Sequence, residues 1–258
     1  MADRMKKDYG KWFPAYKAAD KSSVRIVCFP YAGAGATVYM DWFRFLPDDV
    51  ELFPVAYPMR EKRRKEDTPN DLKILGRQIA AENEMVFREK EVILFGHCEG
   101  SVIAYETAAA LKELYGILPK LYVASGSNPP CVPLSISIDE NMDMDEAAKK
   151  FVELHFIPEA FKNNKVYLKA FVPVLFRDFI LFQNYCDRDI RRLDSPILVV
   201  HGNNDEMINE EHIGDWEKYT SAGVKYAEYP GEHFYITSTI LPNLIDRMIR
   251  ESSDLNEA

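Results

Sequence analysis

The chain has 258 residues, of which 47% are hydrophobic, so it is long enough to bury a sizeable core, and α/β proteins of this length commonly form one domain, here residues 1–258. Charged residues make up 28% of the sequence and the formal net charge is -9, which argues against binding to nucleic acid. Residues 1–23 contain several lysines but no apolar run long enough for a signal peptide or a membrane span, so we expect a cytoplasmic protein.

From residue 24 onward, short β-branched runs alternate with longer amphipathic stretches, a pattern typical of βαβ units around a mostly parallel sheet. Strands are predicted at residues 24–29, 50–57, 91–95, 120–125, 196–201 and 224–229. Helices are predicted at residues 38–46, 71–88, 100–115, 208–219 and 235–250, where apolar residues recur at intervals of three and four. The fold class expected from this order is α/β.

One stretch, residues 128–192, breaks the alternation because it offers helix-like segments rich in Phe, Leu, Tyr and Met but no convincing strand. An apolar helical insertion between two core strands is a candidate lid, since lids separate a reaction from water. The alternative is that these helices pack as ordinary core.

The strongest local signal is an apolar strand that runs into Gly96-His97-Cys98-Glu99-Gly100 and then into a helix. This is the nucleophile-elbow pattern G-x-S-x-G with cysteine in the serine position. The turn needs small residues on both sides because it brings backbone close to neighbouring elements. It also places Cys98 at the N-terminus of the next helix, where the dipole favours a thiolate. We therefore predict that Cys98 is a nucleophile.

Such an elbow predicts an acid and then a base on loops that follow later strands. Asp205 follows the strand predicted at 196–201, and His233 follows the strand that ends at Tyr229. Glu232 is the neighbour of His233 and cannot easily reach its Nδ1, so Asp205 is the expected partner and Glu206 the fallback. Other candidates are expected to have packing or surface roles: Cys28, His97, His155 and His212.

Acyl transfer also needs N–H donors for the developing oxyanion. The small residues of the loop at residues 29–36 would let backbone amides approach a substrate closely. We predict that the backbone N–H groups of Ala32 and Glu99 are these donors. The alternative is a phosphate-binding loop, but the spacing Gly33-x-Gly35 lacks the rest of either nucleotide fingerprint.

Four cysteines stand far apart and form no Cys-x-x-Cys pair: Cys28, Cys98, Cys131 and Cys186. A chain of this size does not need disulfides for stability, so we predict neither a disulfide nor a zinc site. No cofactor is predicted.

The sequence resembles the type II thioesterases that accompany nonribosomal peptide and polyketide synthases. The motifs that match lie in collinear order from about Trp12 to the last predicted helix: Phe29-Pro-Tyr-Ala-Gly-Ala-Gly, Trp42, Pro58-Met-Arg-Glu, Phe95-Gly-His-Cys-Glu-Gly, Ser125-Gly, Pro196 to Asp205, Trp216 and Pro230-Gly-Glu-His-Phe. The resemblance implies an α/β-hydrolase with a helical lid that acts on acyl thioesters of phosphopantetheinyl carrier proteins. By matched position it implies a triad of Cys98, Asp205 and His233.

Three residues of this chain, Cys98, Glu99 and Met59, depart from the family pattern. The family usually has serine at position 98, a hydrophobic residue at position 99 and glycine at position 59. A cysteine makes loading a thioester exchange, and thioesters react with amines far more readily than oxoesters do. Transfer to an amine is therefore an alternative to hydrolysis, although a serine-to-cysteine replacement made to trap an acyl-enzyme would give the same motif. We expect the Glu99 side chain near the mouth of the site, or paired with Arg60.

Two further functions remain open from the sequence. The same constellation on the same fold cleaves oxoesters, so a carboxylesterase is the rival enzyme. A binding module with an inert Cys98 is the non-enzymatic alternative. The basic run at residues 62–65 is either a solvated loop or a surface for an acidic carrier protein.

Overall fold

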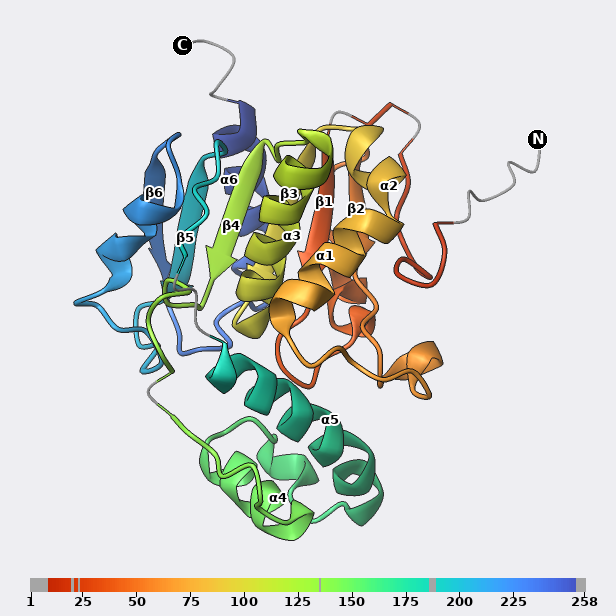
Figure 1. Cartoon of the computed structure of the whole chain (residues 1–258), viewed down its shortest axis with the longest axis vertical. Helices are drawn as coiled ribbons and strands as arrows, with labels where there is room; N and C mark the ends of the chain where they lie inside the picture. The colour runs from red at the N-terminus through yellow and green to blue at the C-terminus, as the bar shows by residue number, and fades with distance from the viewer. Residues whose placement is uncertain (1–8, 20, 23, 135, 186–188, 254–258) are drawn as a thin grey trace.

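A computed structural model describes residues 9–19, 21–22, 24–134, 136–185 and 189–253 (Figure 1). Its strands pair in parallel in the order β2-β1-β3-β4-β5-β6. Their bounds are β1 Val24–Phe29, β2 Val50–Pro54, β3 Val92–His97, β4 Leu121–Ser125, β5 Ile197–Gly202 and β6 Val224–Tyr229. The strands β1 to β4 are buried along their whole length, which explains their largely apolar sequences, and the two charged residues in β1 and β2, Arg25 and Glu51, form a buried ion pair.

Helices cover both faces of the sheet (Figure 1). One face packs against α1 (Leu72–Glu82), α2 (Glu84–Arg88) and α3 (Glu99–Tyr115), and the other packs against the 3₁₀ helix η1 (Ala36–Arg44) and α6 (Leu241–Ser253). Shorter 3₁₀ helices are η2 (Glu61–Arg63) and η4 (Ile213–Tyr219). The predicted α/β-hydrolase class is confirmed.

Strand order reverses beside β1, because the chain passes from β1 to β2 on one side and then to β3 on the other. Open parallel sheets bind ligands at such a switch point, outside the carboxyl ends of the strands. Phe29 at the end of β1 pairs with Gly96 near the end of β3. The register therefore brings the small-residue loop and the predicted nucleophile elbow to the same place.

Residues 128–192 contain α4 (Met144–Glu153), the 3₁₀ helix η3 (Glu159–Phe161) and α5 (Lys165–Asn184), and no strand in their described part. These helices form a separate layer beyond the carboxyl ends of the strands (Figure 1). They have their own apolar cluster, which includes Phe151, Leu175 and Phe179 from the insertion and Ala32 from the loop after β1.

Four predicted helices differ from the structure in type or extent. The stretch predicted at 38–46 is a 3₁₀ helix, and only Ile213–Tyr219 of the stretch predicted at 208–219 is helical. The helix predicted at 71–88 is divided at Asn83, whose side-chain amide donates to the Ile79 carbonyl oxygen over 2.8 Å. The last helix begins at Leu241 rather than 235, next to Pro242, whose fixed φ suits a helix start.

Two predicted strand ends differ by more than one residue. The second strand stops at Pro54 instead of 57, since the Ala56 N–H donates to the Trp12 carbonyl oxygen over 2.8 Å instead of to β1, and the third extends to His97 instead of 95.

Cys28, Cys98 and Cys131 are free cysteines, whereas Cys186 lies outside the described residues. Within the ranges that the structure describes, no group of His, Cys, Asp and Glu side chains has the arrangement of a metal site. No helix in those ranges has the length and apolar character that crossing a bilayer requires.

Candidate active site

The elbow is a sharp turn between β3 and α3. Cys98 has φ 55° and ψ -125°, a left-handed φ that is costly for a residue with a side chain and that often marks a functional site. A Cβ at Gly96 would overlap the Gly100 backbone, and a Cβ at Gly100 would overlap the carbonyl oxygens of Phe29 and Pro30. Both glycines are therefore required by close backbone packing, as the sequence predicts.

Cys98 stands at the N-terminus of α3, where the unpaired N–H groups and the helix dipole favour a negative charge. Its own N–H donates to the Ser125 carbonyl oxygen on β4 over 2.8 Å. The side chain is buried. The geometry therefore fixes Cys98 between β3, β4 and α3.

Asp205 and His233 come together because β5 and β6 are neighbours whose ends are in register at Gly202 and Tyr229. The Asn203 N–H donates to the Tyr229 carbonyl oxygen over 2.8 Å and thereby ties the following loops together. The His233 Nδ1 lies 3.1 and 3.0 Å from the two carboxylate oxygens of Asp205. Both residues are buried, so the carboxylate fixes the orientation of the imidazole.

The opposite ring nitrogen of His233, Nε2, is buried and has no hydrogen-bond partner among the described residues. Burial by itself lowers the pKa of His233, but the charge of a Cys98 thiolate and the hydrogen bond to Asp205 outweigh that effect and raise the pKa to about 10. The arrangement thus favours the protonated form of the His233 imidazole beside Cys98.

The rival acids lie elsewhere. Glu206 and Glu232 are exposed, and neither makes a hydrogen bond to His233 within the described part of the chain. Asp205 is held in place by accepting from the Met207 N–H over 3.1 Å. The structure therefore pairs His233 with Asp205 and with neither rival.

The two predicted oxyanion donors flank the elbow. Ala32 lies in the turn after β1, and Glu99 follows Cys98 directly. Neither backbone N–H donates a hydrogen bond to another group in the part of the chain that the structure describes. Buried N–H groups nearly always have a partner, so two such groups beside a candidate nucleophile are suited to an incoming oxygen.

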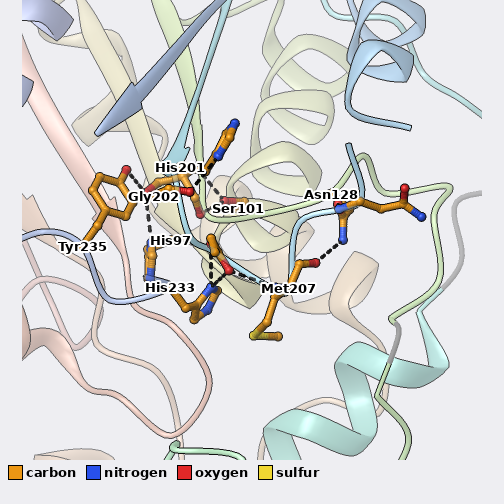
Figure 2. Close-up of polar contacts among 11 residues, drawn as sticks. His97, Ser101, Asn128, His201, Gly202, Met207, His233 and Tyr235 are labelled. Carbon is orange, nitrogen blue, oxygen red and sulfur yellow. Dashed lines mark hydrogen bonds and ion pairs between the residues drawn. The ribbon is translucent and has the colours of Figure 1, made fainter. Parts of the chain in front are cut away.

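The ring of His97 packs near the ring of His233, and the two ring centroids are 5.0 Å apart (Figure 2). Its Nδ1 is 2.9 Å from the Ser125 hydroxyl, which is 2.7 Å from the Tyr235 hydroxyl. Burial and the proximity of His233 hold the pKa of His97 well below its usual value, so its ring is neutral. The packing role expected for His97 fits this buried network, whose Ser125 and Tyr235 the sequence analysis missed because only the fold brings them together.

The Glu99 side chain is not at the mouth of the site, and the expected pairing with Arg60 is also wrong. Glu99 is only 2% exposed, and the Arg60 guanidinium forms its ion pair with Asp178 of α5 instead. Burial and the nearby Asp178 raise the pKa of Glu99 well above the usual range, against the opposing effect of Arg60. Glu99 is therefore a buried acid whose charged form is disfavoured where it lies.

The sequence alone did not single out two buried charged residues, Arg63 and Asp178. Arg63, in the basic run, is buried with its guanidinium 4.0 Å from the Trp12 ring centroid, while the rest of the run is exposed. Asp178 lies among apolar residues of α5, and a lone carboxylate on an apolar helix face is the signal that indicates a buried partner.

Aromatic residues surround the site. The insertion contributes Phe156, whose ring centroid lies 6.5 Å from that of His233. A cavity of about 160 Å³ opens beside His97 and Phe234, and its other walls include Tyr31 and Trp42. This cavity gives room for an apolar group beside His97 and Phe234.

Comparisons with known proteins find similarity to thioesterases. Residues 24–251 match the family model described as a thioesterase domain. The chain is 29% identical over 240 residues to thioesterase PikA5 of Streptomyces venezuelae, an alignment that covers 92% of this chain and 84% of that protein.

Solved structures of thioesterases resemble this fold. The RedJ thioesterase from the prodiginine pathway of Streptomyces coelicolor superposes with a TM-score of 0.79 at 26% identity, covering 93% of this chain and 92% of that one. The type II thioesterase BorB from the borrelidin cluster gives a TM-score of 0.82 at 23% identity, covering 95% of this chain and 99% of that one.

We predict that replacing Cys98 with alanine lowers the pKa of His233 from about 10, because the thiolate is a major cause that raises it and burial alone acts the other way. The measurement is a ¹³C NMR titration of the histidine Cε1 resonances in both proteins. The titration of exposed His212 should be the same in both and serves as the internal control. An unchanged His233 titration in Cys98→Ala would contradict the proposed thiolate–imidazolium pair.

Proposed function

This chain belongs to the thioesterase family, and we propose that its substrates are acyl groups bound as thioesters to the phosphopantetheine arm of carrier proteins in nonribosomal peptide or polyketide synthesis. The relatives support this partner, since PikA5 is named as a thioesterase and RedJ is a thioesterase of a biosynthetic pathway. The usual task of such enzymes is hydrolytic release or editing of acyl chains.

The single observation that carries the proposed mechanism is the buried, unpartnered Nε2 of His233 beside Cys98, with Asp205 on the opposite ring nitrogen. In the first step the Cys98 thiolate attacks the thioester carbonyl carbon. The C–S bond to pantetheine then breaks, and the pantetheine sulfur takes a proton from His233 Nε2. An acyl-Cys98 intermediate and a neutral imidazole remain.

In the second step water attacks the acyl-Cys98 carbonyl carbon while His233 Nε2 accepts a proton from the water. The Cys98 sulfur leaves as the thiolate, and the products are the free acid and the starting ion pair. In both tetrahedral intermediates the oxyanion would accept from the N–H groups of Ala32 and Glu99. Asp205 holds the imidazole and stabilises its charged form throughout.

We propose further that the helical insertion acts as a lid. Phe156 of the insertion packs near His233 and Phe234, and Ala32 belongs to the same apolar cluster as the insertion helices. Cover of this kind keeps bulk water from the acyl-enzyme and strengthens the electrostatic interactions beneath it.

The cysteine at the elbow favours a second candidate reaction, transfer of the acyl group to an amine. A thioester intermediate is aminolysed more readily than the oxoester that a serine would form, whereas the two hydrolyse at comparable rates. The amine nitrogen would attack the acyl carbon, lose a proton to His233 and expel the thiolate. The buried position of Glu99 removes it as an exposed carboxylate for binding that amine.

Variants of two of the three proposed catalytic residues, Cys98 and Asp205, test the mechanism. Cys98→Ala should abolish release of acid from an acyl-loaded carrier protein, and Asp205→Asn should slow it roughly 10²- to 10⁴-fold because the imidazole loses its orienting partner. Glu232→Gln is the matched control, since Glu232 is exposed and lies next to His233 on the loop after β6. Wild-type rates in Cys98→Ala, or a larger loss in Glu232→Gln than in Asp205→Asn, would contradict the assignment.

Cys98→Ser tests the second candidate reaction. If the enzyme transfers acyl groups to amines, the serine variant should give a lower ratio of amide to free acid at a fixed amine concentration, because its intermediate is an oxoester. The ratio is measured by chromatography of the products. An equal ratio in both proteins would exclude a role for the cysteine in choosing the acceptor.

A further inference from the structure

The helix α5 of the insertion packs directly on the turn that contains Ala32. A Cβ added to Gly33 would lie 2.9 Å from the Phe171 ring and 3.2 Å from the Leu175 Cβ. Phe171, Leu175 and Asp178 are spaced by four and three residues, so they share one face of the helix. This face presents one carboxylate to the turn, and the Gly33 N–H donates to Asp178 Oδ2 over 2.7 Å.

Arg60 completes the connection. Its guanidinium makes a two-pronged ion pair with Asp178, with distances of 2.8 Å from Nη1 to Oδ2 and 2.7 Å from Nη2 to Oδ1. Nη1 also donates to the Ala34 carbonyl oxygen over 2.7 Å. Arg60 and Asp178 are buried, so their charges are weakly screened and the fork geometry is strongly directional.

A hydrogen bond within the turn sets which way its first peptide group faces, and the contacts of Asp178 and Arg60 hold the two residues that follow Ala32. The Ala34 N–H donates to the Tyr31 carbonyl oxygen over 2.9 Å, and Gly33 has φ 77°, the conformation that the turn needs. In a planar trans peptide the N–H points opposite to the carbonyl. Because the Tyr31 carbonyl faces into the turn, the Ala32 N–H faces out of it.

We propose that Asp178, through Arg60 and the Gly33 N–H, is the positioning residue that holds the Ala32 N–H in place for the oxyanion. The insertion then supports the oxyanion site as well as covering it. This inference rests on the proposed function, in which Ala32 is a donor to the tetrahedral intermediate. The Arg60–Asp178 ion pair does not take part in the reactions of the Cys98 sulfur. Loss of this ion pair should therefore slow acylation of Cys98 and leave the intrinsic reactivity of its thiolate unchanged.

The test compares two reactions of Cys98 in Asp178→Asn. Acylation by the butanoyl thioester of N-acetylcysteamine passes through an oxyanion, whereas alkylation by iodoacetamide does not. We expect the variant to be acylated about 10- to 100-fold more slowly, because the loss of one oxyanion donor costs about 10²- to 10³-fold and the turn retains part of its support. The alkylation rate at a pH where the thiol is fully ionised should stay within about twofold of the wild type.

Two further variants keep the test decisive. Arg60→Lys retains the charge but loses the fork, so it should show a smaller loss of the same kind even if Asp178→Asn does not fold. Glu51→Gln is the matched control, because it breaks the buried ion pair in which Glu51 lies 2.8 Å from Arg25, which does not contact the turn. It should leave both rates unchanged.

The outcomes are distinct. Normal acylation in folded Asp178→Asn or Arg60→Lys, or equal losses of acylation and alkylation, would overturn the positioning role while leaving the proposed function intact. A wild-type protein whose Cys98 is alkylated but never acylated would overturn the proposed function and this inference with it.

Discussion

The packing of the elbow against the loop after β1 is the contact on which the rest of the site depends. Gly100 lies against the carbonyl oxygens of Phe29 and Pro30 so closely that no side chain fits between them. The pairing of Phe29 with Gly96 sets this approach, and the switch in strand order beside β1 leaves the crevice above it open. Backbone packing alone therefore brings the loop that continues to Ala32 against the elbow that carries Cys98.

The electrostatics of the site follow from burial. Interactions with Cys98 and Asp205 raise the pKa of His233 against the effect of its burial, whereas burial lowers the pKa of His97 and raises the pKa of Glu99. Arg60 and Asp178 neutralise each other nearby. Asp205 lies against the His233 imidazole and Asp178 against the Arg60 guanidinium, so each of these two buried carboxylates has a basic partner.

The elbow and the meeting of Asp205 with His233 could be predicted from the sequence, because both follow from local motifs and from the ends of parallel strands. The elbow is local, because glycines at two positions around Cys98 and an adjoining strand and helix are enough to specify it. Asp205 and His233 follow strand ends, and parallel strands bring their carboxyl ends to one edge, so their meeting could be foreseen as well. The ion pair of Arg60 with Asp178 spans 118 positions and forms only when the insertion docks, which no local pattern specifies. The side chain of Glu99 was misplaced for the same reason, since its burial depends on that docking.

The central claim is that Cys98 itself receives the acyl group. The most direct measurement is to mix the wild-type protein with butanoyl-loaded carrier protein, quench with acid within the first turnover, digest with protease and map the butanoyl group by tandem mass spectrometry. We expect the group as a hydroxylamine-sensitive thioester on Cys98. Turnover of the substrate with no butanoyl group on Cys98, or with the group on another residue, would contradict it.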